Sequence, residues 1–283
     1  MNTAILLISC PDRKGITARI TNFVFQNNGN IEHADQHIDA QTNTFFMRIE
    51  WALDNFNIPR EKIYDEFSVI ASEFAMNWNL YSSDQIPRLA IFTSRSTHCL
   101  YDLLLRHEEK QLRCHIPIII SNHDEAEKVA NHFNIKFKKF AKTAGDRVEI
   151  EKQELKALTD EKIDIIVLAR YMQILTPELI SRFSNRIINI HHSFLPAFAG
   201  KNPYQQAYSR GVKIIGATSH YVTEELDNGP IIEQNTVRIS HRDSVEDLKT
   251  KGQDLEKVVL SRAVRWHLEH KILVYNNKTV IFD

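Results

Sequence analysis

The sequence predicts two α/β units, residues 1–83 and residues 84–283, because the pattern of strands and helices changes once along the chain. The first unit has the order βαββαβ, which is that of a ferredoxin-like sandwich with two helices on one face of a small sheet. The second contains apolar runs separated by helical patterns, as expected for an open, mostly parallel α/β sheet covered on both faces. The polar stretch from Ser82 to Pro87 is the predicted linker.

The elements of the first unit follow from periodicity. Ile16, Ile20 and Phe23 recur at helical spacing, and the Asn-Gly-Asn stretch at 28–30 stops that helix. Pro59 is suited to opening the second helix. The four predicted strands are residues 4–9, 31–39, 45–53 and 78–81.

The second unit begins with buried strands at 89–93, 116–121 and 163–169. Ligands of open α/β sheets collect beyond the carboxyl ends of the strands, so we expect residues 170–175 and 189–193 on one rim. A long helix is expected from Ser244 to about His270, with the charged pattern from Glu246 to Lys257 forming its solvated face.

Two short motifs carry the chemistry: INIHHSFLP, which begins at residue 188, and LDNGP, which begins at residue 226. On a strand, Asn189 and His191 would share one face and His192 would point to the other. A carboxamide can stabilise an oxyanion and an imidazole can move protons, while Asp227 can activate water or orient the imidazole. Taken alone, each motif is better explained as a polar surface turn.

Together, the motifs resemble those of the folate-dependent formyltransferase family, and the resemblance extends over about residues 89–283. It implies a Rossmann-like domain in which Asn189, His191 and Asp227 are catalytic. Ser193 and His220 are then expected to lie in the same substrate site. For an isolated histidine such as His220, a structural role would be the default.

The segment LARYMQIL, residues 168–175, resembles the pterin pocket of the same family. Backbone groups can read the donors and acceptors of a pterin while apolar side chains cover its faces. The resemblance therefore implies substrate contacts from Met172, Ile174 and Leu175, and from the backbone of Gln173. A buried strand that runs into a helix capped by Thr176 and Pro177 accounts for the residues without a ligand.

The chain departs from family members that transfer the formyl group. The turn after the first strand reads TSRSTH, without the glycines that cradle a phosphate, and neither GxxxxGK nor GxGxxG occurs among only 8 glycines. Arg95 in that turn is still able to bind an anion. The tRNA-dependent members carry a further RNA-binding domain, which we do not expect here. Water then remains as the acceptor.

The resemblance thus implies hydrolysis of 10-formyltetrahydrofolate to formate and tetrahydrofolate, which would supply formate and balance the one-carbon pools used in purine biosynthesis. The folate is the substrate, and no cofactor or metal is expected. The main alternative is formyl transfer to a small amine. A metal-dependent amidohydrolase using His191, His192, His220 and Asp227 is disfavoured, because adjacent histidines on a strand diverge. A non-catalytic amino-acid sensor is the third alternative.

The segment CPDRKGI, residues 10–16, resembles the entry of an ACT domain, a class that commonly binds amino acids and associates through its sheets. This implies an amino-acid effector near Asp12, Gly15 and Ile16, or a module that forms a homo-oligomer. Free N–H groups at a helix N-terminus would suit a carboxylate. The alternative is a tight turn in which Asp12 caps the helix.

Composition excludes several other classes. A formal net charge of −1 does not indicate the excess of basic residues that is typical of nucleic-acid binding. The 3 cysteines are odd in number and form no CxxC pair, which predicts a reducing, cytoplasmic location rather than a disulfide framework or a zinc site. The short apolar run near the N-terminus is too short for a signal or membrane helix, so no membrane association is expected.

Overall fold

The computed structural model describes residues 2–141, 147–196 and 203–283. It divides into two compact units. Unit 1 comprises residues 1–86 with His270–Leu273 and Val280–Asp283, and unit 2 comprises Pro87–Glu269 with Val274–Thr279. The division therefore falls after Ile86, whereas the sequence analysis placed it after residue 83, and the return of the C-terminal residues to unit 1 was not anticipated.

Unit 1 is a ferredoxin-like sandwich with the predicted order βαββαβ. Its elements are β1 (Thr3–Pro11), α1 (Ile16–Gln26), β2 (Ile31–Asp39), β3 (Thr44–Ala52), α2 (Arg60–Glu73) and β4 (Asn77–Ser82). The sheet has the strand order β2-β3-β1-β4, with every neighbouring pair antiparallel. Asp12 does not cap α1: the N-cap position is Gly15, and no side chain accepts a hydrogen bond there.

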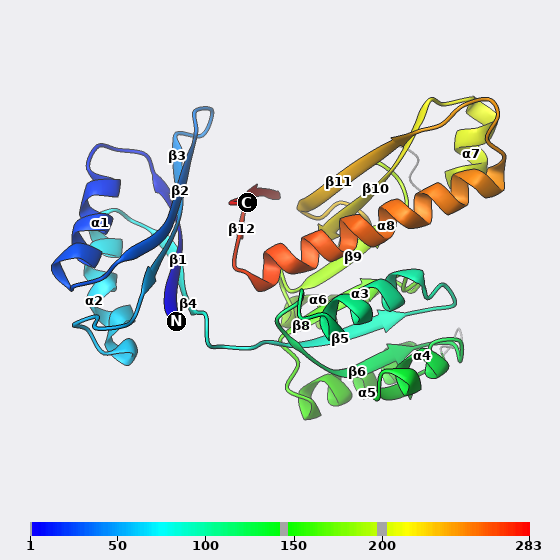
Figure 1. Cartoon of the computed structure of the whole chain (residues 1–283), viewed down its shortest axis with the longest axis horizontal. Coiled ribbons are helices and arrows are strands. Elements are labelled where there is room, and N and C mark those ends of the chain that lie inside the picture. The colour runs from blue at the N-terminus through cyan, green and yellow to red at the C-terminus, as the bar shows by residue number, and fades with distance from the viewer. Residues whose placement is uncertain (1, 142–146, 197–202) are drawn as a thin grey trace. The chain divides into compact units, whose positions relative to one another are not determined.

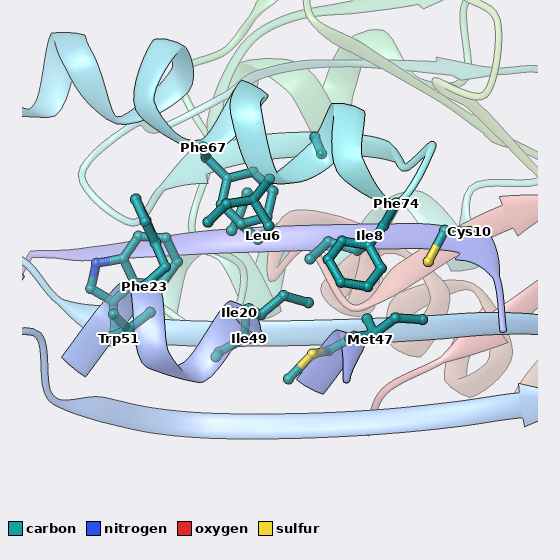
Figure 2. Packing of buried hydrophobic residues seen from close by; sticks show 14 of the residues in the cluster. Leu6, Ile8, Cys10, Ile20, Phe23, Met47, Ile49, Trp51, Phe67 and Phe74 are labelled. Atoms are coloured by element: carbon teal, nitrogen blue, oxygen red, sulfur yellow. The ribbon is translucent and has the colours of Figure 1, made fainter. Parts of the chain in front are cut away.

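Both helices of unit 1 cover one face of this sheet (Figure 1). Phe67 from α2 and Ile20 from α1 are fully buried against strand residues such as Leu6 and Trp51 (Figure 2). Burial of each such side chain stabilises the fold by roughly 1.5–3 kcal/mol. The apolar positions spaced along the helices therefore form the core of the unit.

Unit 2 is built on a seven-stranded sheet with the order β11-β10-β9-β8-β5-β6-β7. The five strands from β9 to β7 are parallel, and β10 and β11 are antiparallel additions at one edge. The strands are β5 (Arg88–Thr93), β6 (His115–Ser121), β7 (Lys136–Lys139), β8 (Ile165–Ala169), β9 (Ile187–His191), β10 (Ile214–Tyr221) and β11 (Ile231–Arg238). The predicted open, mostly parallel α/β fold is confirmed.

The helices of unit 2 pack on this sheet, and α8 runs along β10 and β11 (Figure 1). They are α3 (His98–Glu108), α4 (Glu127–His132), α5 (Arg147–Asp160), α6 (Pro177–Arg182), α7 (Pro203–Arg210) and α8 (Val245–Leu268). Ser244 caps α8 in a capping box with Asp247, and Thr176 caps α6 as predicted. A final hairpin of β12 (Ile272–Tyr275) and β13 (Lys278–Ile281) was not foreseen. Among the residues described, no helix is long and apolar enough to cross a membrane.

Candidate active site

A cavity of about 1050 Å³ lies at the carboxyl ends of the central strands of unit 2. The segments that follow β8 and β9 line it together, as the sequence analysis expected. Further walls come from the N-terminal parts of α3, α7 and α8 and from the loop between β10 and β11. All three residues predicted to be catalytic, Asn189, His191 and Asp227, line this one cavity.

Asn189 is held by a partner on the neighbouring strand. In the antiparallel register of β9 and β10 it lies directly opposite His220. The Nδ2 atom of Asn189 is 3.1 Å from Nε2 of His220, and Nδ1 of His220 is 2.9 Å from the backbone carbonyl oxygen of Tyr221. Because that carbonyl can only accept, Nδ1 carries the proton, and in the neutral imidazole Nε2 accepts from the Asn189 amide. His220 thus orients Asn189, and the second N–H of the amide remains for a ligand.

Asp227 faces both histidines of the site. One carboxylate oxygen, Oδ2, is 3.2 Å from Nδ1 of His191, and the other, Oδ1, is 3.7 Å from Nε2 of His220. The hydrogen bond from His191 is the main cause that holds the pKa of Asp227 well below its usual range. Asp227 is therefore a carboxylate throughout the neutral pH range.

The loop that presents Asp227 depends on Gly229. A Cβ atom at position 229 would lie 1.8 Å from the carbonyl oxygen of Tyr221, so no other residue fits without moving the loop. Asp227 itself has a φ of 54°, in the left-handed region that Asp tolerates better than most residues. The LDNGP motif is thus a tight turn that fixes a carboxylate beside His191.

The free nitrogen of His191 completes this arrangement. Since Nδ1 donates to Asp227, Nε2 is the nitrogen that remains for proton transfer. Nε2 is buried and has no hydrogen-bond partner among the residues that the structure describes. His191 and Asp227 consequently form an acid–base dyad of the kind in which the carboxylate sets the tautomer of the imidazole.

Two residues of the INIHHSFLP motif depart from expectation. His192 does not point away from the site: β9 ends at His191, so strand alternation no longer applies, and His192 lines the cavity with its ring centroid 5.1 Å from that of His191. Burial, together with the nearby Arg170, lowers the pKa of His192 to about 4. Ser193 is buried but does not line the cavity, and its carbonyl oxygen accepts from Thr218.

All four predicted pterin contacts, Met172 to Leu175, line the cavity. Met172 and Ile174 expose 61% and 57% of their surface although they are apolar, whereas Leu175 is buried. Exposed apolar side chains at a cavity rim are suited to covering the face of a flat ring. The backbone N–H of Met172 donates to the Ser94 hydroxyl at 3.1 Å, which ties this segment to the end of β5.

The sequence analysis missed the helix that holds the pterin segment. Arg147, Glu151 and Glu154 recur at helical spacing on α5 and so share one face. Arg147 donates to the carbonyl oxygen of Ile174 at 2.6 Å, Glu151 accepts from the N–H and hydroxyl of Thr176, and Glu154 accepts from the Tyr171 hydroxyl at 2.9 Å. Both glutamates are buried, so this face of α5 fixes the start, middle and end of residues 171–176.

A second cluster of polar side chains lies in the same cavity, with Glu256 at its centre. This residue falls within the charged pattern that was expected to be solvated, yet only 1% of its side chain is exposed, so that part of the prediction is wrong. His98 Nε2 lies 2.8 Å from one Glu256 oxygen, and the Tyr204 hydroxyl lies 2.7 Å from the other. Tyr204 reaches it because position 252 is glycine, where a Cβ would lie 2.0 Å from the hydroxyl oxygen.

The donors His98, Cys99 and Glu256 also lie within 4.8 Å of one another, in the manner of metal ligands. Burial raises the pKa of the Cys99 thiol well above its usual value, so it stays protonated. The guanidinium of Arg170 lies 3.5 Å from Glu256. A protonated thiol and an adjacent cation disfavour a metal ion at this position.

Comparison with known proteins supports the fold assigned to each of the two units. Residues 87–264 match the formyl transferase family, and residues 4–70 match the ACT domain. A formyltetrahydrofolate deformylase of Synechocystis sp. is 54% identical over 280 residues, which are 99% of this chain and 98% of the relative. The chain belongs to the formyltetrahydrofolate deformylase family. The crystal structure of a deformylase from Pseudomonas syringae has a TM-score of 0.97 and 46% identity, covering 100% of this chain and 95% of that one.

A glycinamide ribonucleotide transformylase from Symbiobacterium toebii shares the catalytic fold, with a TM-score of 0.66 and 29% identity. It covers 72% of this chain, while the similarity extends over 98% of the transformylase. The ACT domain thus distinguishes the deformylase family from this neighbour. The expectation of a folate-dependent deformylase with an N-terminal ACT domain is confirmed.

Proposed function

We propose that this chain hydrolyses 10-formyltetrahydrofolate to formate and tetrahydrofolate in the cavity of unit 2. The observation that carries the proposal is the His191–Asp227 pair at 3.2 Å, in the same cavity as Asn189 and the apolar segment from Met172 to Leu175. The segment receives the pterin, and the polar set lies where a formyl group on N10 must react.

The steps follow from the geometry. His191 Nε2 takes a proton from water as the water oxygen attacks the formyl carbon, and Asp227 stabilises the imidazolium that forms. The carbonyl oxygen becomes an oxyanion, which accepts from the remaining N–H of Asn189. Cleavage of the C–N10 bond then places the His191 proton on N10 and leaves formic acid, which ionises to formate.

The structure offers grounds for choosing between the two roles of Asp227. A carboxylate whose pKa is held far below the neutral range is a weak base, so it is poorly suited to deprotonating water itself. We therefore assign Asp227 to orienting His191 and stabilising its charge. His220 orients Asn189, and neither a metal nor a resident cofactor enters the scheme.

Incubation of the purified protein with 10-formyltetrahydrofolate alone tests the proposal. We expect one formate and one tetrahydrofolate per turnover, unaffected by a chelator. Turnover that requires an added amine, with formyl-amine as the product, would support the transfer alternative. Loss of activity in chelator, restored specifically by zinc, would support a metallohydrolase instead.

For the ACT domain we propose that a free amino acid binds at the turn before α1 and alters activity. Gly15 has a φ of 95°, and the first turn of α1 has no side-chain cap, so its N–H groups are available to a carboxylate. Asp12 is next to this turn and could receive the ammonium group. Linkage then requires the folate to change the affinity for the amino acid by the same factor.

Calorimetry with a panel of amino acids, with and without folate, tests this role. Gly15→Ala is a suitable variant because a Cβ at this position meets nothing within 4 Å, although the positive φ strains it. We expect weaker binding and a loss of the activity change. If no amino acid binds, the competing proposal remains, in which the domain assembles a homo-oligomer, and light scattering would report it.

The three cysteines, which are free and buried, support a reducing location for this activity, and we propose the cytoplasm.

A further inference from the structure

One charged group in the cavity wall has no part in the reaction steps above. Arg170 directly follows β8 and lines the cavity, and only 15% of its side chain is exposed. Its Nε and Nη1 atoms are buried and have no hydrogen-bond partner among the residues that the structure describes. A buried guanidinium with unfilled donors is costly unless a ligand satisfies it.

Glu256 is the nearest anion, but it does not satisfy Arg170. Its separation of 3.5 Å from Nε is that of an ion pair without hydrogen-bond geometry. Its two oxygens are instead engaged at 2.8 Å by His98 and at 2.7 Å by Tyr204. Each oxygen of the carboxylate thus already accepts one hydrogen bond from another residue, whereas the guanidinium retains donors for a further acceptor.

The backbone at Arg170 supports a specific role for the side chain. Its φ of 63° lies in the left-handed region, which arginine adopts at a cost that glycine would avoid. Non-glycine residues held in this region cluster at binding and catalytic sites. Thirteen non-glycine residues among those described have a positive φ, and Arg170 and Asp227 are the two of them that line this cavity.

Arg170 lies in the same cavity as the catalytic dyad and near His192. His192 follows His191 in sequence, and its ring centroid lies 5.1 Å from that of His191. Burial lowers the pKa of His192, and the nearby Arg170 adds to that effect. Arg170, His192 and the catalytic dyad thus line the same cavity.

We propose that Arg170 binds a small carboxylate, namely the formate that the reaction releases. The proposal rests on the proposed function, because that reaction supplies formate in this cavity. A planar carboxylate matches the parallel donors of a guanidinium, and such bidentate pairs are stronger than neutral hydrogen bonds.

Direct binding of sodium formate to the substrate-free protein tests the subsite without turnover. Broadening of the 13C-formate signal would be titrated at constant ionic strength for the wild type, Arg170→Met and Arg170→Lys. We expect Arg170→Met to weaken binding roughly 10- to 100-fold and Arg170→Lys to weaken it less. Arg182→Met is the matched control, since that side chain is 57% exposed and does not line the cavity.

Formate inhibition of turnover should weaken in parallel in the two Arg170 variants. Unchanged formate binding in Arg170→Met and Arg170→Lys, or no binding to the wild type, would overturn the subsite even if the enzyme is active.

The glutamate tail of the folate is a second source of carboxylate. If Arg170→Met raised KM for 10-formyltetrahydrofolate but not for 10-formyltetrahydropteroate, with formate binding intact, Arg170 would be assigned to that tail and the formate proposal rejected. Failure of all forms to release formate from the folate would instead contradict the proposed function.

Discussion

Replacing Asp227 with Asn removes the charge that faces His191 while keeping the shape of the side chain. The two groups are 3.2 Å apart, with side-chain exposures of 8% for His191 and 20% for Asp227. At an effective dielectric constant of about 20, attraction between a carboxylate and an imidazolium at this distance is about 5 kcal/mol. If the transition state carries the imidazolium, kcat should fall by about 10³- to 10⁴-fold.

Steady-state release of tetrahydrofolate would measure this loss, and calorimetry with a non-reactive folate would confirm that affinity changes little. Asp254→Asn, on an exposed part of α8 with 67% of the side chain accessible, is the matched control and should be fully active. Because the pKa of Asp227 lies far below its usual range, the carboxylate stays ionised in the wild type throughout an assay at pH 6 to 8. A loss of less than tenfold in Asp227→Asn would refute the dyad.

Two further predictions concern parts that support the site, and a third concerns the stability of unit 1. Gly229→Ala places a Cβ 1.8 Å from a backbone carbonyl oxygen and should reduce kcat at least 100-fold by moving the Asp227 loop. Gly211→Ala, where the φ of 62° strains an alanine but a Cβ meets nothing within 4 Å, should retain activity in the same assay. Glu151→Gln should raise KM for the folate about tenfold with a smaller change in kcat. The exposed control Glu149→Gln should leave KM unchanged. An unchanged KM in Glu151→Gln would show that α5 does not position the pterin segment. Burial lowers the pKa of His270 from 6.5 to about 4, so its contribution to stability is complete above pH 6.5 and is lost as pH falls toward 4. Between pH 7.5 and 5.0, the free energy of unfolding in urea should therefore decrease by about 2 kcal/mol less in His270→Gln than in the wild type. An equal decrease in the two proteins would contradict this assignment.

Local sequence was sufficient for elements whose periodicity is strong. The helical spacing of Ile16, Ile20 and Phe23 correctly placed α1, and the turn residues around Gly229 marked a loop that geometry requires. Asn189 and His191 could be placed near each other because strand alternation fixes their relation.

Contacts between segments that are distant in sequence could not be predicted from local patterns. The pairing of Asn189 with His220 depends on the register between β9 and an antiparallel strand that no local pattern specifies. Glu256 lies among charged neighbours on α8, and its burial follows from the helix face that α3 and α7 cover. The hydrogen bonds between α5 and residues 171–176 likewise depend on tertiary packing that buries two glutamates, which composition alone would place at the surface.

The central claim is that water, activated by His191 and Asp227, attacks the formyl carbon. Single-turnover reaction of excess enzyme with 10-formyltetrahydrofolate in H₂¹⁸O, followed by mass spectrometry of the formate, tests it most directly. The account predicts one ¹⁸O atom in each formate molecule, with formation slowed by about 10³- to 10⁴-fold in Asp227→Asn. Formate without ¹⁸O, or labelled formate produced at the same rate by the variant, would contradict it.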